Sequence, residues 1–360
     1  MDTSKSAGTN VESNGDTTSG FVKKESFGSK AKRHCARFWW LWLIVFAIIV
    51  LVVVLPIIYV GVPHKGQKEL DKADIEVTRQ GISDPKPNSF HLVLNNKVTS
   101  SSSYHPTLSS FNGSLFLEDS LPDIKPFGYI TIPEVKSESE VQVDVEQDVE
   151  VADMDQFIAY NKLVISSEEF RLGLRGRPSV KLDGLPSFDA DYNKVVTMKG
   201  EACNPFHSQS KRAEADILQG LNKLAGLAIT SADIRTVPEP DGATLLGTLF
   251  IPNPSVLGVS MGNVTMDLSV NGTYIGYTLI PDLNLMPGNN TFNMRSYVDT
   301  KLVLGLVTKQ YTDFVLPLDI IGNSSINSAG DRIPWLEAAI KQNTIRYDLD
   351  LSAALGGGGS

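Results

Sequence analysis

Apolar and polar residues alternate along much of the chain after residue 63, with the period of two that a half-buried β-strand has. Over 141–151, valines hold one set of positions and mostly acidic residues hold the other. Over 264–270, apolar residues alternate with Thr, Asp and Ser, and Asn271-Gly272 then supplies a dipeptide typical of a tight hairpin turn. These patterns predict antiparallel strands with one buried face each.

A short phrase occurs twice in this β-rich part of the chain. GYITIPEV at Gly128–Val135 matches GYTLIPDL at Gly276–Leu283. We interpret the matches as a tandem repeat of one β-domain whose loops differ in length. In each copy we expect the glycine to let a neighbouring strand approach, and Pro133 or Pro281 to end the strand, because proline cannot donate to the ladder. Two further pairs match in the same order: Ala73–Ile75 with Ala232–Ile234, and His91–Val98 with Leu249–Val256.

One segment is apolar throughout and predicts a transmembrane helix. Phe38–Val62 contains no charged residue and is long enough, at 1.5 Å per residue, to cross a hydrocarbon core of about 30 Å. A cleaved signal peptide is the alternative, but the run is too long, a long tail precedes it, and no small-residue cleavage site follows. Positive residues are more numerous before the span than after it, which predicts a cytosolic N-terminus and a lumenal or extracellular remainder.

The fold class that follows is mainly β, with two tandem antiparallel β-sandwiches behind one N-terminal transmembrane helix. Helical spacing of leucines predicts a helix between the two repeats, and Pro334 is placed to begin a shorter one that runs to Ile340. The expected segments are a disordered cytosolic tail (1–37), the transmembrane helix (38–62), a first β-sandwich (63–200), a connecting helix (201–226), a second β-sandwich (227–350) and a flexible tail (351–360).

Charge and cysteine content narrow the function classes. The 360 residues carry a formal net charge of −9, and the basic tail leaves the β-rich part more acidic still, which argues against nucleic-acid binding. The only two cysteines, Cys35 and Cys203, lie on opposite sides of the predicted membrane and therefore cannot pair within one chain. Cys35, beside the span, is a palmitoylation candidate, with an unmodified thiol as the alternative.

Five Asn-x-Ser/Thr sequons all follow the predicted span, which agrees with a lumenal location for that part of the chain. The glycosylation candidates are Asn112, Asn263, Asn271, Asn289 and Asn323.

The second repeat resembles a known family. GTLFIPNPSVLGVSMGNVTMDLSVNGTYIGYTLIPDLNLMPGNNTF, at Gly247–Phe292, is similar to the water-stress and hypersensitive-response domain of type-2 late-embryogenesis-abundant (LEA) proteins. The whole layout resembles a fungal family of uncharacterised single-pass membrane proteins, related to vacuolar-membrane proteins. The resemblance implies a compact antiparallel β-sandwich and a vacuolar membrane location, with the plasma membrane or the endoplasmic reticulum as alternatives. The first repeat departs from the motif, since Asn95-Asn96 stands where the second has Asn253-Pro254.

Candidate catalytic patterns are weak. Gly258–Gly262 fits the G-x-S-x-G nucleophile elbow around Ser260, but a strand pattern follows it and no histidine comes later in the chain, so we interpret it as a glycine-rich turn. Cys203 and His207 stand four residues apart, and a buried structural cysteine is the alternative to a thiol nucleophile. Two carboxylates of a glycosidase need no fixed spacing, and nothing selects a pair. The acidic strand face over 142–150 is interpreted as solvated.

We therefore expect a non-enzymatic membrane protein, without a catalytic, metal or cofactor site, whose lumenal β-sandwich domains bind a lipid or a protein partner. The alternatives are a membrane tether or sensor that signals through its cytosolic tail, and a cryptic lumenal hydrolase. A continuous apolar groove between sheets would favour the lipid.

Overall fold

The structure is a computed structural model that describes residues 27–100, 105–167, 170–198, 221, 224, 226–235 and 237–352. The chain separates into two units, Met1–Tyr59 and Val60–Ser360, and the second is called here the β-rich unit. The connecting helix predicted over 201–226 lies largely outside the described residues, as do residues 1–26 of the predicted tail and residues 353–360.

The N-terminal helical segment is longer than the predicted span. It consists of α1 (Phe27–Pro56), a π-helical turn (Ile57–Gly61) and α2 (Val62–Lys72). Among the described residues, Trp39–Lys72 is the one helical stretch long and apolar enough to cross a membrane. Helix α1 begins inside the predicted 1–37 tail, and α2 takes up the start of the predicted first sandwich. Extending an existing helix adds one hydrogen bond per residue and avoids the cost of nucleating a new helix, which favours extension of the helix at both ends.

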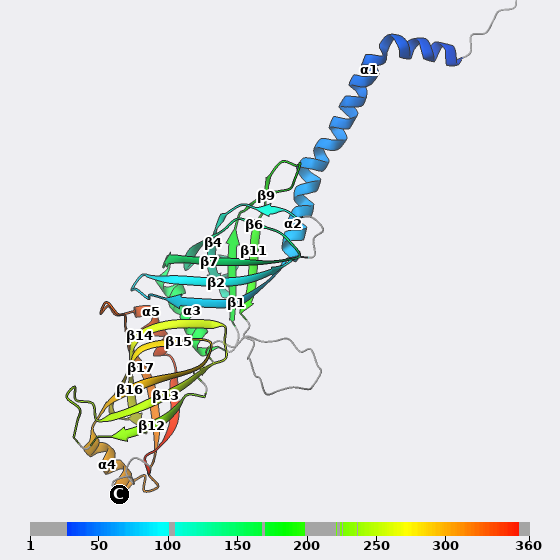
Figure 1. Ribbon diagram of the computed structural model, residues 1–360. Helices are drawn as coiled ribbons and strands as arrows, with labels where there is room; N and C mark the ends of the chain where they lie inside the picture. The colour runs from blue at the N-terminus through cyan, green and yellow to red at the C-terminus, as the bar shows by residue number, and fades with distance from the viewer. Residues whose placement is uncertain are drawn as a thin grey trace, which may run out of the picture. The chain divides into compact units, whose positions relative to one another are not determined.

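The first half of the β-rich unit, residues 74–198, contains three groups of strands (Figure 1). The order β1-β2-β7 belongs to the largest sheet, and two four-stranded sheets have the orders β11-β8-β4-β5 and β10-β9-β3-β6. Helix α3 (Met154–Ser166) follows β7, and a short 3-10 turn (Glu118–Ser120) follows β4. The strands are β1 (Asp74–Ser83), β2 (Ser89–Thr99), β3 (Thr107–Leu108), β4 (Phe111–Leu117), β5 (Gly128–Ile132), β6 (Val135–Lys136), β7 (Glu140–Glu150), β8 (Phe170–Gly176), β9 (Ser179–Lys181), β10 (Phe188–Asp189) and β11 (Tyr192–Met198).

The second half, residues 226–352, is one antiparallel array with the order β12-β13-β16-β15-β14-β17-β18. Two helices accompany it, α4 (Thr300–Lys309) and α5 (Pro334–Ile340), and α5 has the bounds that the sequence predicted. The strands are β12 (Ala228–Ile234), β13 (Leu245–Asn253), β14 (Leu257–Val270), β15 (Thr273–Leu285), β16 (Gly288–Val298), β17 (Val315–Ile326) and β18 (Thr344–Asp350).

The mainly β class behind one N-terminal apolar helix is thereby confirmed, and the halves are joined in a way the sequence did not predict. Residues Gln80–Ile82 of β1 pair in parallel with Leu257–Val259 of β14. Ten strands drawn from both predicted sandwiches therefore belong to one sheet.

The repeated motif, at Gly128–Val135 and Gly276–Leu283, confirms the expectation for its glycines but not for both prolines. Both glycines permit a close approach, because a Cβ would meet a Val149 methyl at Gly128 and the Tyr297 carbonyl at Gly276. Strand β5 ends before Pro133, as expected. The same expectation is wrong for Pro281, because β15 continues past it to Leu285. The register with β14 shifts there, a β-bulge that accommodates a residue unable to donate to the ladder.

An aromatic cluster packs the two halves together. The Trp335 side chain on α5 is fully buried, and its ring centroid lies 4.9 Å from that of Phe157 on α3 and 6.1 Å from that of Phe90 on β2. The Trp335 Nε1 also donates a hydrogen bond of 2.9 Å to the Lys86 carbonyl oxygen. Asn327 Nδ2 donates similarly to the Pro85 carbonyl oxygen at 3.1 Å. This packing and the shared sheet make the β-rich unit one compact body.

Candidate functional site

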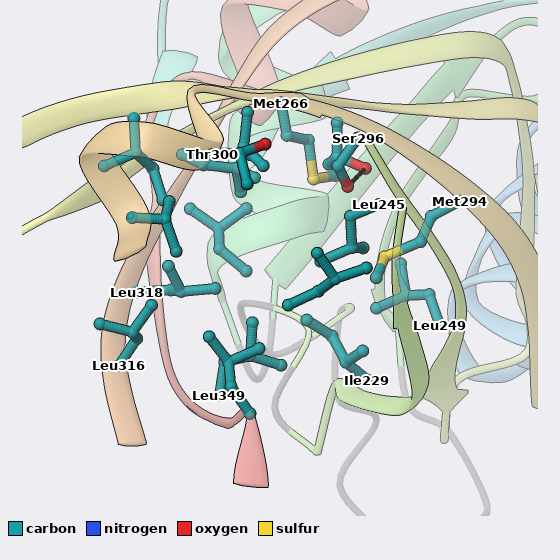
Figure 2. Close-up of a pocket in the computed structure, with 18 of the residues that line it drawn as sticks. Ile229, Leu245, Leu249, Met266, Met294, Ser296, Thr300, Leu316, Leu318 and Leu349 are labelled. Carbon is teal, nitrogen blue, oxygen red and sulfur yellow. Dashed lines mark hydrogen bonds between the residues drawn. The ribbon is translucent and has the colours of Figure 1, made fainter. Parts of the chain in front are cut away.

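The inward faces of the second-half strands surround an apolar cavity (Figure 2). Alternation along β14 places Met266 and Leu268 on the inside, and Leu249 of β13, Leu318 of β17 and Leu349 of β18 face the same space. The cavity has a volume of about 70 Å³. This is several times the roughly 10–15 Å³ that a single water molecule needs.

Helix α4 covers one side of this cavity. The Asp299 carboxylate caps it, accepting hydrogen bonds of 3.0 Å from the backbone N–H groups of Lys301 and Leu302, which fixes where the helix starts. Val303 and Val307 then point into the cavity from one face of the helix. Leu304 also lines the cavity while its side chain is 50% exposed, so it forms part of the rim.

The edge strands of the second half lie close together beside the cavity. In the strand order, β12 and β18 are the two ends of the array. The Tyr347 hydroxyl on β18 donates a hydrogen bond of 3.2 Å to the Ile229 carbonyl oxygen on β12. Ile229 and Leu349 line the cavity from these two strands (Figure 2).

The polar side chains in the cavity wall are few, and two of them are hydrogen-bonded. Its described lining residues are aliphatic or methionine apart from Thr278, Ser296 and Thr300, and none of them is ionisable. The buried Ser296 Oγ donates to Thr278 Oγ1 at 3.0 Å, and Thr278 Oγ1 donates to the Arg295 carbonyl oxygen at 3.5 Å. An apolar ligand can therefore contact the wall while these two hydroxyls stay hydrogen-bonded.

The sequence indicated the strands that build this cavity but not the cavity itself. Helix α4 was missed, although Asp299 is a favourable N-cap residue and apolar residues at 302, 303, 306 and 307 follow it with helical spacing. Helix α3 was missed in the same way, with Asp153 as its cap, which accepts from the Gln156 backbone N–H at 3.0 Å.

The glycosylation candidates differ in exposure. Asn112, Asn271 and Asn289 are exposed, whereas Asn263 and Asn323 are half-buried. Asn263 Oδ1 accepts from the Asp282 backbone N–H at 3.1 Å, and Asn323 Nδ2 donates to Asp267 Oδ1 at 2.9 Å. Glycosylation at these candidate sites stays a prediction.

Ser260 is the catalytic candidate that lies among the described residues. Ser260 lies within β14, which continues to Val270 where a nucleophile elbow needs a turn into a helix, and its Oγ donates to Asn284 Oδ1 at 2.9 Å. Cys203 and His207 lie outside the described residues. For Cys35 only the backbone is described, as part of α1, and its palmitoylation stays a prediction.

The acidic face of β7 is paired with polar residues of β2. His91 Nδ1 lies 2.8 Å from Asp148 Oδ1, and its Nε2 lies 3.3 Å from Glu146 Oε1. Asn95 Nδ2 donates to Asp144 Oδ1 at 2.7 Å. The hydrogen bond to Asp148 raises the pKa of His91 above its usual value. Within the described part of the chain, no group of three or more His, Cys, Asp or Glu residues is arranged to hold a metal ion.

Comparisons with known proteins give a family match over part of the chain. Residues 125–268 match a family described as "Protein of unknown function (DUF3712)". The match runs from just before β5 into β14, and so includes strands of both halves. No curated protein matches the chain.

Solved structures give only distant similarity. A structural-genomics target, SoR45, shares 6% identity with a TM-score of 0.21, covering 40% of this chain and 97% of its own. The periplasmic chaperone SfaE shares 10% identity with a TM-score of 0.18, covering 76% of this chain and 98% of its own. A bacterial adhesin from Mobiluncus mulieris shares 10% identity with a TM-score of 0.20, covering 75% and 83%. Similarity at this level carries no argument about function.

Proposed function

We propose that this chain is a non-enzymatic single-pass membrane protein whose β-rich unit binds the apolar chain of a lipid inside its second half. The observation that carries the proposal is the cavity between the inward strand faces and α4. Moving a methylene group from water to an uncharged, almost wholly aliphatic wall is favourable by about 0.8 kcal/mol. The same wall gives a charged or strongly polar ligand no partner to replace its water.

The proposed topology places the N-terminus in the cytosol and the β-rich unit in a lumen. The Lys and Arg residues before the span support the orientation, and the sequons after it are consistent with the location. The resemblance to vacuolar-membrane relatives supports a vacuolar membrane. A membrane anchor would keep such a domain close to its source of lipid, and in the tether or sensor alternative the same ligand would be sensed.

A protein partner is the second candidate, and exposed tyrosines on β15 favour it. The side chains of Tyr274 and Tyr277 are 57% and 38% exposed. The Tyr277 ring stacks on that of Tyr297, with centroids 4.8 Å apart. Tyrosine is enriched at protein interfaces because it combines a large apolar body with a polar tip.

Displacement of a fluorescent fatty-acid analogue tests the lipid proposal. Leu318→Trp places a larger side chain in the cavity and should weaken binding of the analogue at least tenfold. Val237→Trp is the matched control, because Val237 is 78% exposed and does not line the cavity, and it should bind as the wild type does. Thermal melts of both variants confirm folding. Equal affinity in wild type and folded Leu318→Trp would contradict the proposal.

A further inference from the structure

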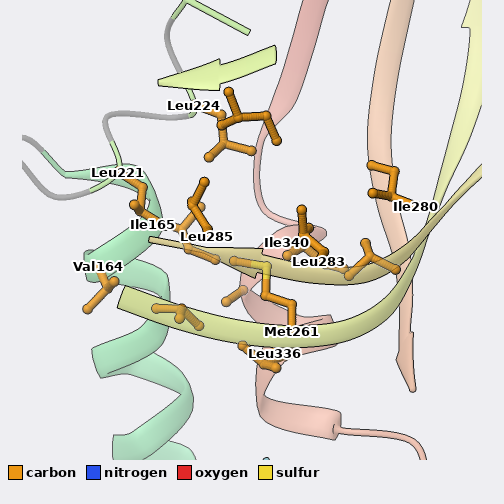
Figure 3. Close-up of a cluster of buried hydrophobic side chains, with 14 of the residues drawn as sticks. Val164, Ile165, Leu221, Leu224, Met261, Ile280, Leu283, Leu285, Leu336 and Ile340 are labelled. Carbon is orange, nitrogen blue, oxygen red and sulfur yellow. The ribbon is translucent and has the colours of Figure 1, made fainter. Parts of the chain in front are cut away.

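The core of the second half contains a second cavity beyond the first. Its volume is about 20 Å³, which is room for about one or two methylene groups. Met261, Leu285 and Ile340 are among the residues around it, and Ile165 of α3 reaches it from the first half (Figure 3). It therefore lies on the side of the core where the two halves pack together.

The two cavities occupy successive levels along the same strands. On β14, Met261 lines the second cavity and Leu268 lines the first. On β15, Leu283 lines the second, while Ile280 lines the first. Strands β13, β17 and β18 show the same division, with one inward residue or more at each level. The levels are thus stacked along the strand direction, and an extended chain that entered the first would point toward the second.

Met266 stands between the two levels. Of the described residues, it is the one that lines both cavities, and its side chain is only 4% exposed. Methionine is unbranched and has three rotatable side-chain bonds, so it can change rotamer without a backbone shift. A β-branched Ile, which also extends to a δ-carbon but is restricted at χ1, would be a stiffer partition.

We infer that Met266 sets the length of the apolar chain that the cavity accepts, as a movable partition between the first and second cavities. The inference rests on the proposed lipid binding. A chain that ends in the first cavity meets the Met266 thioether, and a longer chain must displace that side chain to place its end in the second cavity. Each methylene that newly enters strengthens binding roughly fourfold, so opening the partition should favour the longer chains about tenfold.

The test measures which chain lengths remain bound. The full chain, purified in a sterol-based detergent that has no straight alkyl tail, is incubated with an equimolar mixture of saturated fatty acids of increasing length. Native mass spectrometry then reports the bound species. Met266→Ala should shift the bound distribution toward longer chains, by about tenfold in the ratio of the species just beyond the wild-type limit to the species at that limit.

Met261→Ala is the matched control. It removes the same side-chain volume from the wall of the second cavity but leaves the partition in place, so the bound distribution should stay that of the wild type. If Met266→Ala does not fold, as judged by its thermal melt, Met266→Val removes less volume and should shift the distribution in the same direction.

The outcomes separate the two proposals. Wild-type protein that retains no fatty acid of any length overturns the lipid proposal, and this inference with it. Wild-type protein that binds, together with a folded Met266→Ala or Met266→Val variant of unchanged distribution, overturns the partition alone. An equal shift in Met261→Ala also overturns it, because the limit would then depend on total cavity volume.

Discussion

Ser296 on β16 and Thr278 on β15 hydrogen-bond to each other at 3.0 Å within a cavity whose other described walls are almost entirely apolar. Both side chains are nearly inaccessible to solvent, at 2% and 5% exposure. The pair keeps the hydroxyls satisfied when no ligand polar group is near. The cavity can therefore hold an apolar chain without an added polar cost.

Replacing Thr278 by valine should destabilise the protein although the shape of the side chain is conserved. The Ser296 hydroxyl loses its acceptor in the buried wall, which costs about 1–3 kcal/mol in the free energy of unfolding. Thr278→Ser, which retains a hydroxyl, should cost less. The double variant Thr278→Val/Ser296→Ala should recover part of the loss because both polar groups are gone. Urea unfolding checks this, and a Thr278→Val variant as stable as wild type would contradict the buried pairing.

Trp335 should be a major contributor to the stability of the β-rich unit. Trp335→Ala removes the ring that packs against Phe157 and Phe90 and should cost about 3–5 kcal/mol. Trp335→Phe keeps most of the packing but loses the bond to the Lys86 carbonyl oxygen, and should cost about 1 kcal/mol from that bond. Val237→Ala at an exposed site should change stability by less than about 0.5 kcal/mol. Comparable effects of Trp335→Ala and Val237→Ala would mean that the halves do not pack in this way.

Strand periodicity was the most reliable guide from sequence to structure. The valine alternation over 141–151 became β7, and Asn271-Gly272 became the β14–β15 turn, with φ of +48° and +76° at its two residues. These features follow from the local geometry of strands and hairpin turns. Pro281 shows where local rules stop, because a bulge inside a long hairpin can accommodate a residue that would otherwise end a strand.

The cavity could not be predicted from the same patterns. Inward positions such as Met266 and Leu318 alternate as they would in a filled core, and a strand pattern carries no information on the distance between facing walls. That distance depends on how the sheet curls and on where α4 is placed. Local sequence patterns could not predict the parallel pairing of β1 with β14 either, because residues Gln80–Ile82 and Leu257–Val259 are far apart in the chain.

The stability of the first half should depend on the charge of His91. Its pKa is raised by the hydrogen bond to Asp148, so the folded state binds the proton more tightly than the unfolded state. The resulting stabilisation is fully present below the unfolded pKa of about 6.5 and is lost as the pH rises through the raised value. We expect the melting temperature of wild type relative to His91→Gln to be higher at pH 5.5 than at pH 8.5, at matched ionic strength. A difference that is independent of pH would contradict the His91–Asp148 pairing.

Glycan attachment should be tolerated best at the exposed sequons. Asn271 and Asn289 are exposed, whereas a glycan on Asn323 Nδ2 would disturb its bond to Asp267. Asn271→Gln and Asn289→Gln should each reduce the mobility shift that endoglycosidase causes, and Asn323→Gln should leave it unchanged. Absence of any shift in protein from glycosylating cells would count against the lumenal placement of the β-rich unit.

The most direct measurement of the central claim is the mass of whatever remains in the cavity after purification. The full chain is isolated from its own membrane in a sterol-based detergent and examined by native mass spectrometry, followed by lipid extraction. We expect one lipid per chain on the wild type, strongly depleted in Leu318→Trp and retained in Val237→Trp. Wild-type protein without a lipid adduct, or equal lipid content in folded Leu318→Trp, would contradict the assignment of this cavity to an apolar chain.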